Sequence, residues 1–170
     1  LADIFRLHPL VREDVVNVHQ RPKVEPYEDQ LFIVTRMMSL ADQGDEVEHE
    51  QLSIVLGRNF VVTFQDRPGD VLDPVRERIR TGAPIRRSGP DHLAYALVDA
   101  VVDHYFPVLE RFGERIAALE EEVIARPDAV TLGKIHQAKR DLLLVRRAAW
   151  PQRDALADAR RQDEPAAVDP

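Results

Sequence analysis

The chain has 170 residues and a mass of 19.4 kDa, which suits one modest domain or a small domain with an appendage. Its content of 44% hydrophobic and 31% charged residues excludes collagenous, mucin-like and wholly disordered chains. The net charge of -7 argues against general electrostatic binding to nucleic acid or anionic membranes, and favours cations as partners. Because the chain has no cysteine, only histidine and carboxylate side chains are left to bind a metal.

No apolar run approaches the roughly 20 residues that a membrane helix needs. The first residue is Leu1, and no signal peptide is visible after it. We therefore expect a water-soluble piece of a longer protein.

The first half of the chain predicts a short helix followed by three strands. Apolar residues recur at helical spacing between Leu10 and Val18, and prolines flank this stretch. Residues 27–40, 51–56 and 60–64 are rich in β-branched and large apolar side chains, and the turn at 57–59 contains Gly and Asn. These features predict an antiparallel meander, in which the acidic stretch 42–50 forms a solvated turn.

The second half predicts helices. Asp73 and Pro74 are expected to begin a short helix, with the Asp73 carboxylate as its N-cap. A long apolar stripe with spacings of three and four then runs from Leu93 to Val123, and Pro107 inside it predicts a kink or break about one turn earlier. A second stripe follows residues 126–128 and is expected to stop before Pro151. Two such stripes joined by a tight turn form an antiparallel helical hairpin.

Few residues suggest chemistry. The common catalytic signatures are absent, so we do not expect an enzyme. Glu13 and Asp14 form either a solvated helix face or a site for a hard cation such as Mg²⁺, which needs only one or two carboxylates. His92, Asp99 and Asp103 share one polar helix face, where the ordinary interpretation is again a solvated surface.

Five arginines lie close together in the sequence without aromatic residues among them. This cluster predicts solvated side chains or salt bridges rather than nucleic-acid binding. Its members are Arg76, Arg78, Arg80, Arg86 and Arg87.

Three longer segments carry a resemblance to a known family. They are HPLVREDVVNVHQRPK at 8–23, GDVLDPVRERIR at 69–80 and YALVDAVVDHYF at 95–106, supported by LEEEV at 119–123 and LLLVRRAAWPQR at 142–153. In order and spacing they resemble the cytoplasmic domain of CorA-type magnesium transporters.

The resemblance implies an α/β/α sandwich in the α+β class, with an incomplete, mainly antiparallel sheet and a long antiparallel helical hairpin. Residues 1–88 would be a partial α/β domain, 89–160 the hairpin packed on it, and 161–170 a linker towards a stalk and membrane helices. The sheet would lack its first strands, and the exposed edge would invite self-association.

The resemblance also implies a function. The chain would be a regulatory, cation-sensing domain on the cytoplasmic side of the membrane, in a homopentamer that transports Mg²⁺, with Co²⁺, Ni²⁺ or Zn²⁺ as other ions. Asp14 matches a carboxylate that binds a regulatory ion between subunits, and Glu13 and Asp99 match acids near a second site. Asp103 is an additional candidate, and His104 stands where some relatives carry a carboxylate. The alternatives are a domain of a zinc-transporting relative and a stand-alone helical interaction module.

Overall fold

The computed structural model describes residues 2–41, 46–67, 71–82 and 84–163, with side chains through residue 158. The elements in chain order are α1 (Pro9–Val16), β1 (Lys23–Tyr27), β2 (Gln30–Leu40), β3 (Val47–Leu56), β4 (Val61–Phe64), α2 (Asp73–Arg80), the 3₁₀ turn η1 (Pro84–Arg86), α3 (Pro90–Asp103), α4 (Tyr105–Ala125) and α5 (Ala129–Asp163).

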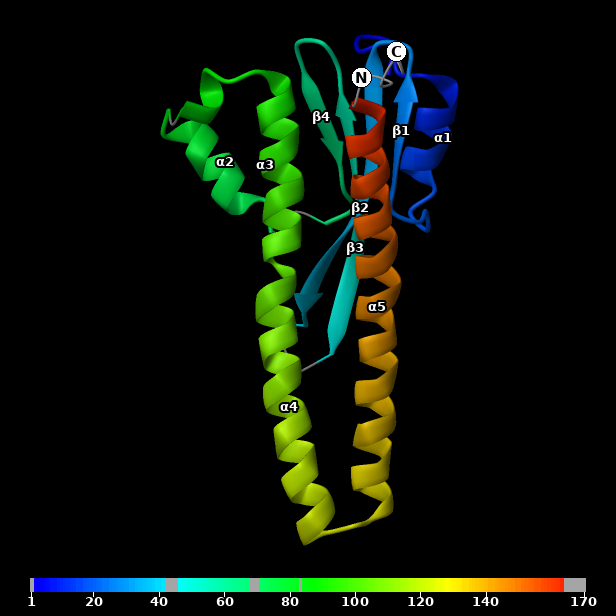
Figure 1. The fold of residues 1–170 in the computed structure, drawn as a ribbon, viewed down its shortest axis with the longest axis vertical. Coiled ribbons are helices and arrows are strands. Elements are labelled where there is room, and N and C mark those ends of the chain that lie inside the picture. The colour runs from blue at the N-terminus through cyan, green and yellow to red at the C-terminus, as the bar shows by residue number, and fades with distance from the viewer. Residues whose placement is uncertain (1, 42–45, 68–70, 83, 164–170) are drawn as a thin grey trace, which may run out of the picture.

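These elements form three layers around an open antiparallel sheet with strand order β1-β2-β3-β4 (Figure 1). Helix α1 covers one face, and α3, α4 and α5 cover the other. The lower parts of α4 and α5 extend beyond the sheet as an antiparallel hairpin. The predicted α/β/α arrangement with a helical hairpin is therefore confirmed.

The sheet has one strand more than the sequence predicts. The strand expected at 27–40 is β2, and the additional strand β1 precedes it and forms a hairpin with it, in which Tyr27 pairs with Gln30 and Glu28 has a φ of 49°. Pro26 is tolerated in β1 because β1 is an edge strand, where one side of the ladder needs no donor. Part of the acidic stretch is also strand, since β3 begins at Val47, whereas residues 42–45 lie outside the described part of the chain.

The alternation of side chains along β2 builds two hydrophobic clusters. Phe32 and Val34 point towards α1 and pack with Val11, and all three are at most 1% exposed. Ile33 belongs to the larger cluster on the opposite face, formed with α3, α4 and α5. Because the side-chain period of a strand is two, one strand supplies both cores.

Two predictions about helix ends meet different outcomes. The break expected before Pro107 is confirmed, because α3 ends at Asp103 and α4 begins at Tyr105. The proline ring clashes with the carbonyl four residues earlier, which is that of Asp103. The predicted N-cap Asp73 is wrong: the cap is Leu72, and the Asp73 carboxylate instead binds Arg76 at 2.8 Å.

Helix α5 does not stop before Pro151 but continues to Asp163. Tertiary contacts outweigh the lost helix bond, because the next residue, Gln152, is buried and bonded to the sheet. Its Oε1 accepts from Thr35 Oγ1 at 2.6 Å and from the Tyr105 hydroxyl at 3.3 Å. Tyr105 also donates to the carbonyl of Arg36 at 2.8 Å. This cluster connects β2, α4 and α5, and burial raises the pKa of the Tyr105 phenol.

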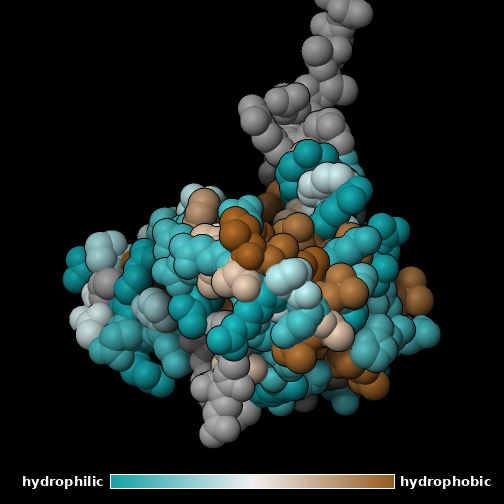
Figure 2. Space-filling model, turned by 90° about the horizontal axis from the view of Figure 1, so that it is seen from below, coloured by the Kyte–Doolittle hydropathy of each residue, from teal (hydrophilic) through white to brown (hydrophobic). Residues whose placement is uncertain are grey.

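Polar contacts close the hairpin. Asp128 Oδ1 accepts from the backbone N–H groups of Val130 and Thr131, both at 2.9 Å, and these bonds lower the pKa of its carboxyl. Arg115 on α4 binds Asp141 on α5 at 2.7 Å. Figure 2, seen from below, shows apolar surface divided by polar surface at this end of the molecule.

Candidate functional site

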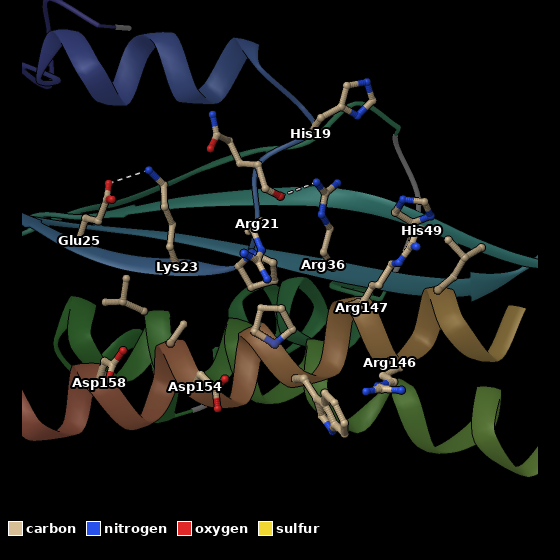
Figure 3. Close-up of a pocket in the computed structure, with 18 of the residues that line it drawn as sticks. His19, Arg21, Lys23, Glu25, Arg36, His49, Arg146, Arg147, Asp154 and Asp158 are labelled. Carbon is tan, nitrogen blue, oxygen red and sulfur yellow. Dashed lines mark hydrogen bonds and ion pairs between the residues drawn. The ribbon is translucent and has the colours of Figure 1, made fainter. Parts of the chain in front are cut away.

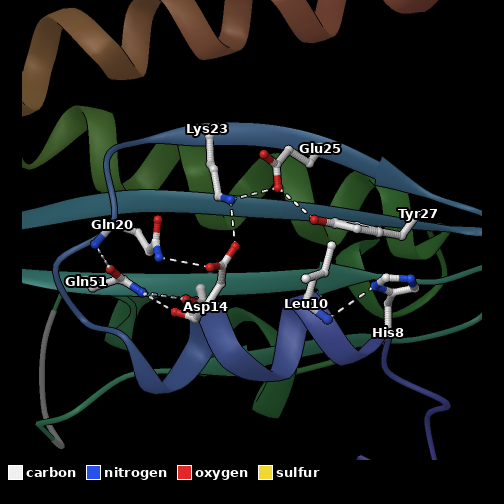
Figure 4. A network of polar contacts seen from close by, with 9 residues as sticks. His8, Leu10, Asp14, Gln20, Lys23, Glu25, Tyr27 and Gln51 are labelled. Atoms are coloured by element: carbon white, nitrogen blue, oxygen red, sulfur yellow. Dashed lines mark hydrogen bonds and ion pairs between the residues drawn. The ribbon is translucent and has the colours of Figure 1, made fainter.

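Asp14 is held in a polar network between α1 and β1 (Figure 4). Its Oδ2 lies 2.6 Å from Lys23 Nζ, and its Oδ1 accepts from Gln20 Nε2 at 2.9 Å. Gln51 on β3 donates to the Asp14 main-chain carbonyl at 3.3 Å. The Asp14 side chain is 17% exposed. Within one chain, this carboxylate already has a cationic partner but keeps some access to solvent.

The local sequence explains this position. His8 Nδ1 accepts from the Leu10 N–H at 3.3 Å, and Pro9 occupies the first turn of α1. Val11 then packs against the sheet with no exposed surface. Asp14, three residues later, lies on the same side of the helix, whereas Glu13 is turned out and exposed.

Lys23 lies between two carboxylates. Its Nζ is 2.6 Å from Asp14 and 2.7 Å from Glu25, whose Oε2 also accepts from the Tyr27 hydroxyl at 2.9 Å. Burial lowers the pKa of Lys23, but the hydrogen bonds and negative charges of Asp14 and Glu25 outweigh that effect and raise the pKa above its ordinary value. The ammonium therefore stays charged and paired at neutral pH.

Replacing Lys23 by methionine is expected to lower the free energy of unfolding by about 2 kcal/mol at pH 7, because two partly buried carboxylates lose their cation. Since the folded-state pKa is raised above 10.5, the stabilisation is complete below that pH and is lost as the pH rises through the folded-state pKa. Urea unfolding across this range should show the two proteins converging at high pH. Lys139→Met, at an exposed position on α5, is the control. A stability difference that is the same above and below the transition would contradict this account.

Asp99 and Asp103 lie one turn apart on α3, and both are exposed. Two aromatic side chains on the same helical region are also exposed, Tyr95 at 65% and Phe106 at 61%. His104 follows at the junction of α3 and α4 and is partly buried. The predicted polar face therefore carries solvent-exposed aromatic rings beside its carboxylates, and aromatic residues are enriched on surfaces that contact another protein.

The structure does not bring the two groups of predicted site residues together. Glu13 and Asp14 lie on α1, on one face of the sheet, whereas Asp99 and Asp103 lie on α3, on the other face (Figure 1). Among the described residues, no group of three or more histidines and carboxylates is placed to hold a metal ion. An ion bound by both groups would need two copies of the chain.

The arginine cluster around α2 forms local contacts. Arg76 binds Asp73 and also donates to Gln65 Oε1, both at 2.8 Å, and Arg80 lies 3.7 Å from Glu77. These short-range ion pairs agree with the expectation of salt-bridged or solvated arginines.

Sequence reasoning missed the partners of Asp14. Gln20 and Lys23 lie in the segment that the sequence analysis quotes for its family resemblance, but their separation from Asp14 has no helical or strand periodicity. The chain turns back after α1, and this reversal places Lys23 of β1 above Asp14. If the sequence analysis had predicted a strand starting at Lys23, that strand would have placed Lys23 next to the helix that carries Asp14 and so indicated the ion pair.

Comparison with known proteins agrees with this geometry. The family described as "CorA-like Mg2+ transporter protein" matches residues 1–170. A cobalt/magnesium transport protein CorA from Thermotoga maritima is 46% identical over 166 residues, covering 97% of this chain and 47% of that protein. The chain thus belongs to the CorA-like Mg²⁺ transporter family, which is a family of transporters and not of enzymes. It spans 47% of the length of the Thermotoga maritima protein and 48% of the length of the putative metal ion transporter YfjQ from Bacillus subtilis, which is 33% identical over 156 residues, covering 92% of this chain.

Solved structures share the fold. The complete CorA magnesium transporter of Methanocaldococcus jannaschii superimposes with a TM-score of 0.80 at 16% identity, covering 99% of this chain and 52% of that one. The ZntB cytoplasmic domain of Vibrio parahaemolyticus gives 0.75 at 14% identity, covering 95% and 64%. Across the described ranges, no helix combines the length and the apolar character required to cross a bilayer.

Proposed function

We propose that this chain is the cation-sensing, gating domain of a CorA-like Mg²⁺ transport protein, on the cytoplasmic side of the membrane. The observation that carries the proposal is the separation of Glu13 and Asp14 from Asp99 and Asp103 on opposite sides of one chain. Neighbouring copies in a homo-oligomer, a pentamer in the intact protein, would bring α1 of one copy to α3 of the next. Residues 1–88 would supply Glu13 and Asp14, residues 89–160 would supply Asp99 and Asp103, and 161–170 would lead to the rest of the protein. By the family resemblance, Asp14 would bind a regulatory ion between copies, and Glu13 and Asp99 would lie near a second site.

The mechanism follows from charge. Carboxylates that face one another across a contact between copies repel, and a bound divalent cation offsets this repulsion. Hydrated Mg²⁺ keeps most of its waters and needs only one or two carboxylates. Ion binding would therefore favour the packed arrangement of copies, and release of the ion would loosen it.

Lys23 tunes such a site. Its ammonium lies 2.6 Å from Asp14 Oδ2, so an incoming cation meets a carboxylate whose charge is partly neutralised. The affinity for the ion is lowered by this competition. A sensor of a cytosolic ion that is abundant needs only a modest affinity, because occupancy must change within the physiological concentration range.

Zinc is the alternative ion. The similarity in fold to a ZntB domain supports it, and so do His92 and His104 near the α3 carboxylates, because imidazole is a preferred zinc ligand. The third alternative, a stand-alone helical interaction module, predicts no response to any divalent ion.

Sedimentation velocity of the chain at matched ionic strength tests the proposal. We expect MgCl₂ to strengthen self-association, and Asp14→Asn and Asp99→Asn each to weaken the Mg²⁺ effect about fivefold or more. Glu121→Gln, an exposed carboxylate on α4, is the matched control and should behave as the unaltered chain. A response to Zn²⁺ but not to Mg²⁺ would favour the zinc alternative, and no response to either ion would contradict cation sensing.

A further inference from the structure

A groove of about 1050 Å³ runs between the β1 side of the sheet and α5, and Lys23 and Glu25 are among the residues that line it (Figure 3). Its size suits a small organic ligand. Strands β1, β2 and β3, the connection before β1 and one side of α5 all contribute to its wall.

One end of this groove is strongly basic. The basic residues that line it come from four parts of the chain, and they are His19, Arg21, Arg36, His49, Arg146 and Arg147. Figure 3 shows Arg21, Arg36, His49 and Arg147 in the space between the sheet and α5, whereas Arg146 lies on the far side of α5. In a chain with a net charge of -7, such a concentration of positive charge is local and opposes the average.

These basic groups are not neutralised by carboxylates of the described chain. The Arg36 guanidinium donates hydrogen bonds to the main-chain carbonyls of Val18 and Gln20, which carry no net charge. Arg21 and Arg147 form no ion pair with any carboxylate among the described residues. Like charges gathered in this way repel one another unless an anion lies between them.

The pKa of His49 is affected by the positive charges around it. Its pKa is lowered by partial burial and then by the positive charges of Arg36 and His19. Arg147 of α5 lies beside it in Figure 3. An anion in the groove would reverse this effect and be held by charged hydrogen bonds, which are stronger than neutral ones.

The acidic residues that line the groove lie at its other end. Figure 3 places Glu25, Asp154 and Asp158 away from His49 and Arg147. Glu25 is paired with Lys23 at 2.7 Å, and Asp154 with Arg153 at 2.7 Å. The groove is therefore polarised, and an anionic ligand would place its charge at the His49 end.

We propose that this groove binds a soluble, phosphate-bearing small molecule, with its phosphates held by Arg21, Arg36 and Arg147. Arginine suits this role because its planar guanidinium can donate two parallel bonds to phosphate oxygens. A small soluble anion fits better than a membrane surface, because the acidic chain as a whole repels an extended anionic surface. The groove adjoins the proposed cation site, because Gln20 and Lys23 line the groove and also bind Asp14, but none of the three arginines is a partner of Asp14.

The fluorescence of Trp150 can report ligand binding in the groove. It is the single tryptophan of the chain, it lines the groove, and its ring lies 4.0 Å from the Arg146 guanidinium. Binding of phosphates at Arg147, which lies three residues before Trp150 on α5, should change the charge near the indole ring and with it the fluorescence of Trp150. Isothermal titration calorimetry gives a second readout that does not depend on the ring.

The test titrates the chain with sodium tripolyphosphate at constant ionic strength. We expect saturable binding by calorimetry, and we expect Arg21→Gln and Arg147→Gln, at exposed positions where folding is unaffected, each to weaken it about tenfold. Arg87→Gln, an exposed arginine outside the groove, should change the affinity less than about twofold. No saturable heat, or equal losses in all three variants, would overturn the proposal. So would binding to phosphatidylglycerol vesicles without binding to tripolyphosphate.

Discussion

Replacing Phe32 by alanine is expected to lower the free energy of unfolding by about 4 kcal/mol. The Phe32 side chain has no exposed surface and lies at the centre of the cluster that joins α1 to the sheet. Its removal would leave a cavity that the paired strands cannot close, because backbone hydrogen bonds hold β2 between β1 and β3. Urea unfolding measured by circular dichroism gives the change.

Phe106→Ala is the matched control for this substitution. Phe106 is 61% exposed, so the same truncation should cost less than about 0.5 kcal/mol. Hydrogen exchange in the Phe32 variant should also increase in α1, because the buried cluster that contains Val11 loses its aromatic side chain from β2. Equal losses of stability in the two variants would show that the α1 cluster is not a core.

Replacing Asp141 by alanine is expected to cost about 3 kcal/mol. Asp141 lies on α5 with only 3% of its side chain exposed, and its Oδ2 is 2.7 Å from Arg115 Nη1 of α4. Its Oδ1 accepts from Gln137 Nε2 at 2.8 Å. The substitution removes the bond from Asp141 to the Arg115 guanidinium, which is 15% exposed and therefore poorly solvated.

A double variant separates the contribution of the charges of Arg115 and Asp141 to stability from the contribution of side-chain packing at the same positions. Arg115→Met with Asp141→Leu replaces both charges by apolar groups and should recover most of the stability, since a buried pair stabilises little relative to apolar side chains. Glu114→Ala removes one partner of the exposed Arg111–Glu114 pair and should cost less than about 0.5 kcal/mol. Thermal unfolding in which Asp141→Ala and Glu114→Ala have the same effect would contradict this assignment.

Local patterns in the sequence predict most of the fold. The alternation in β2 and the Gly-Asn turn before β4 identify the meander, and Pro107 identifies the break between α3 and α4. These features depend on near neighbours in the sequence. The continuation of α5 through Pro151 does not, because it rests on the bond from Thr35 to Gln152, residues that are 117 positions apart.

The candidate sites were less predictable. The sequence identifies Asp14 as a carboxylate of interest through its family resemblance, but the ammonium of Lys23 beside it depends on the chain reversal that starts β1. The basic groove is even more difficult to predict from the sequence, because His49, Arg36 and Arg147 come from three separate elements. The arginines that are adjacent in the sequence, around α2, form mostly local ion pairs instead.

The most direct test of the central claim measures Mg²⁺ uptake into proteoliposomes that carry the complete gene product, with the Mg²⁺ concentration on the side of this domain preset. Cation sensing predicts that uptake falls as this concentration rises. It also predicts that Asp14→Asn raises the concentration needed for inhibition about tenfold, whereas Glu121→Gln leaves it unchanged. Uptake by Asp14→Asn that is inhibited at the same Mg²⁺ concentration as the unaltered protein would contradict the role proposed for this domain.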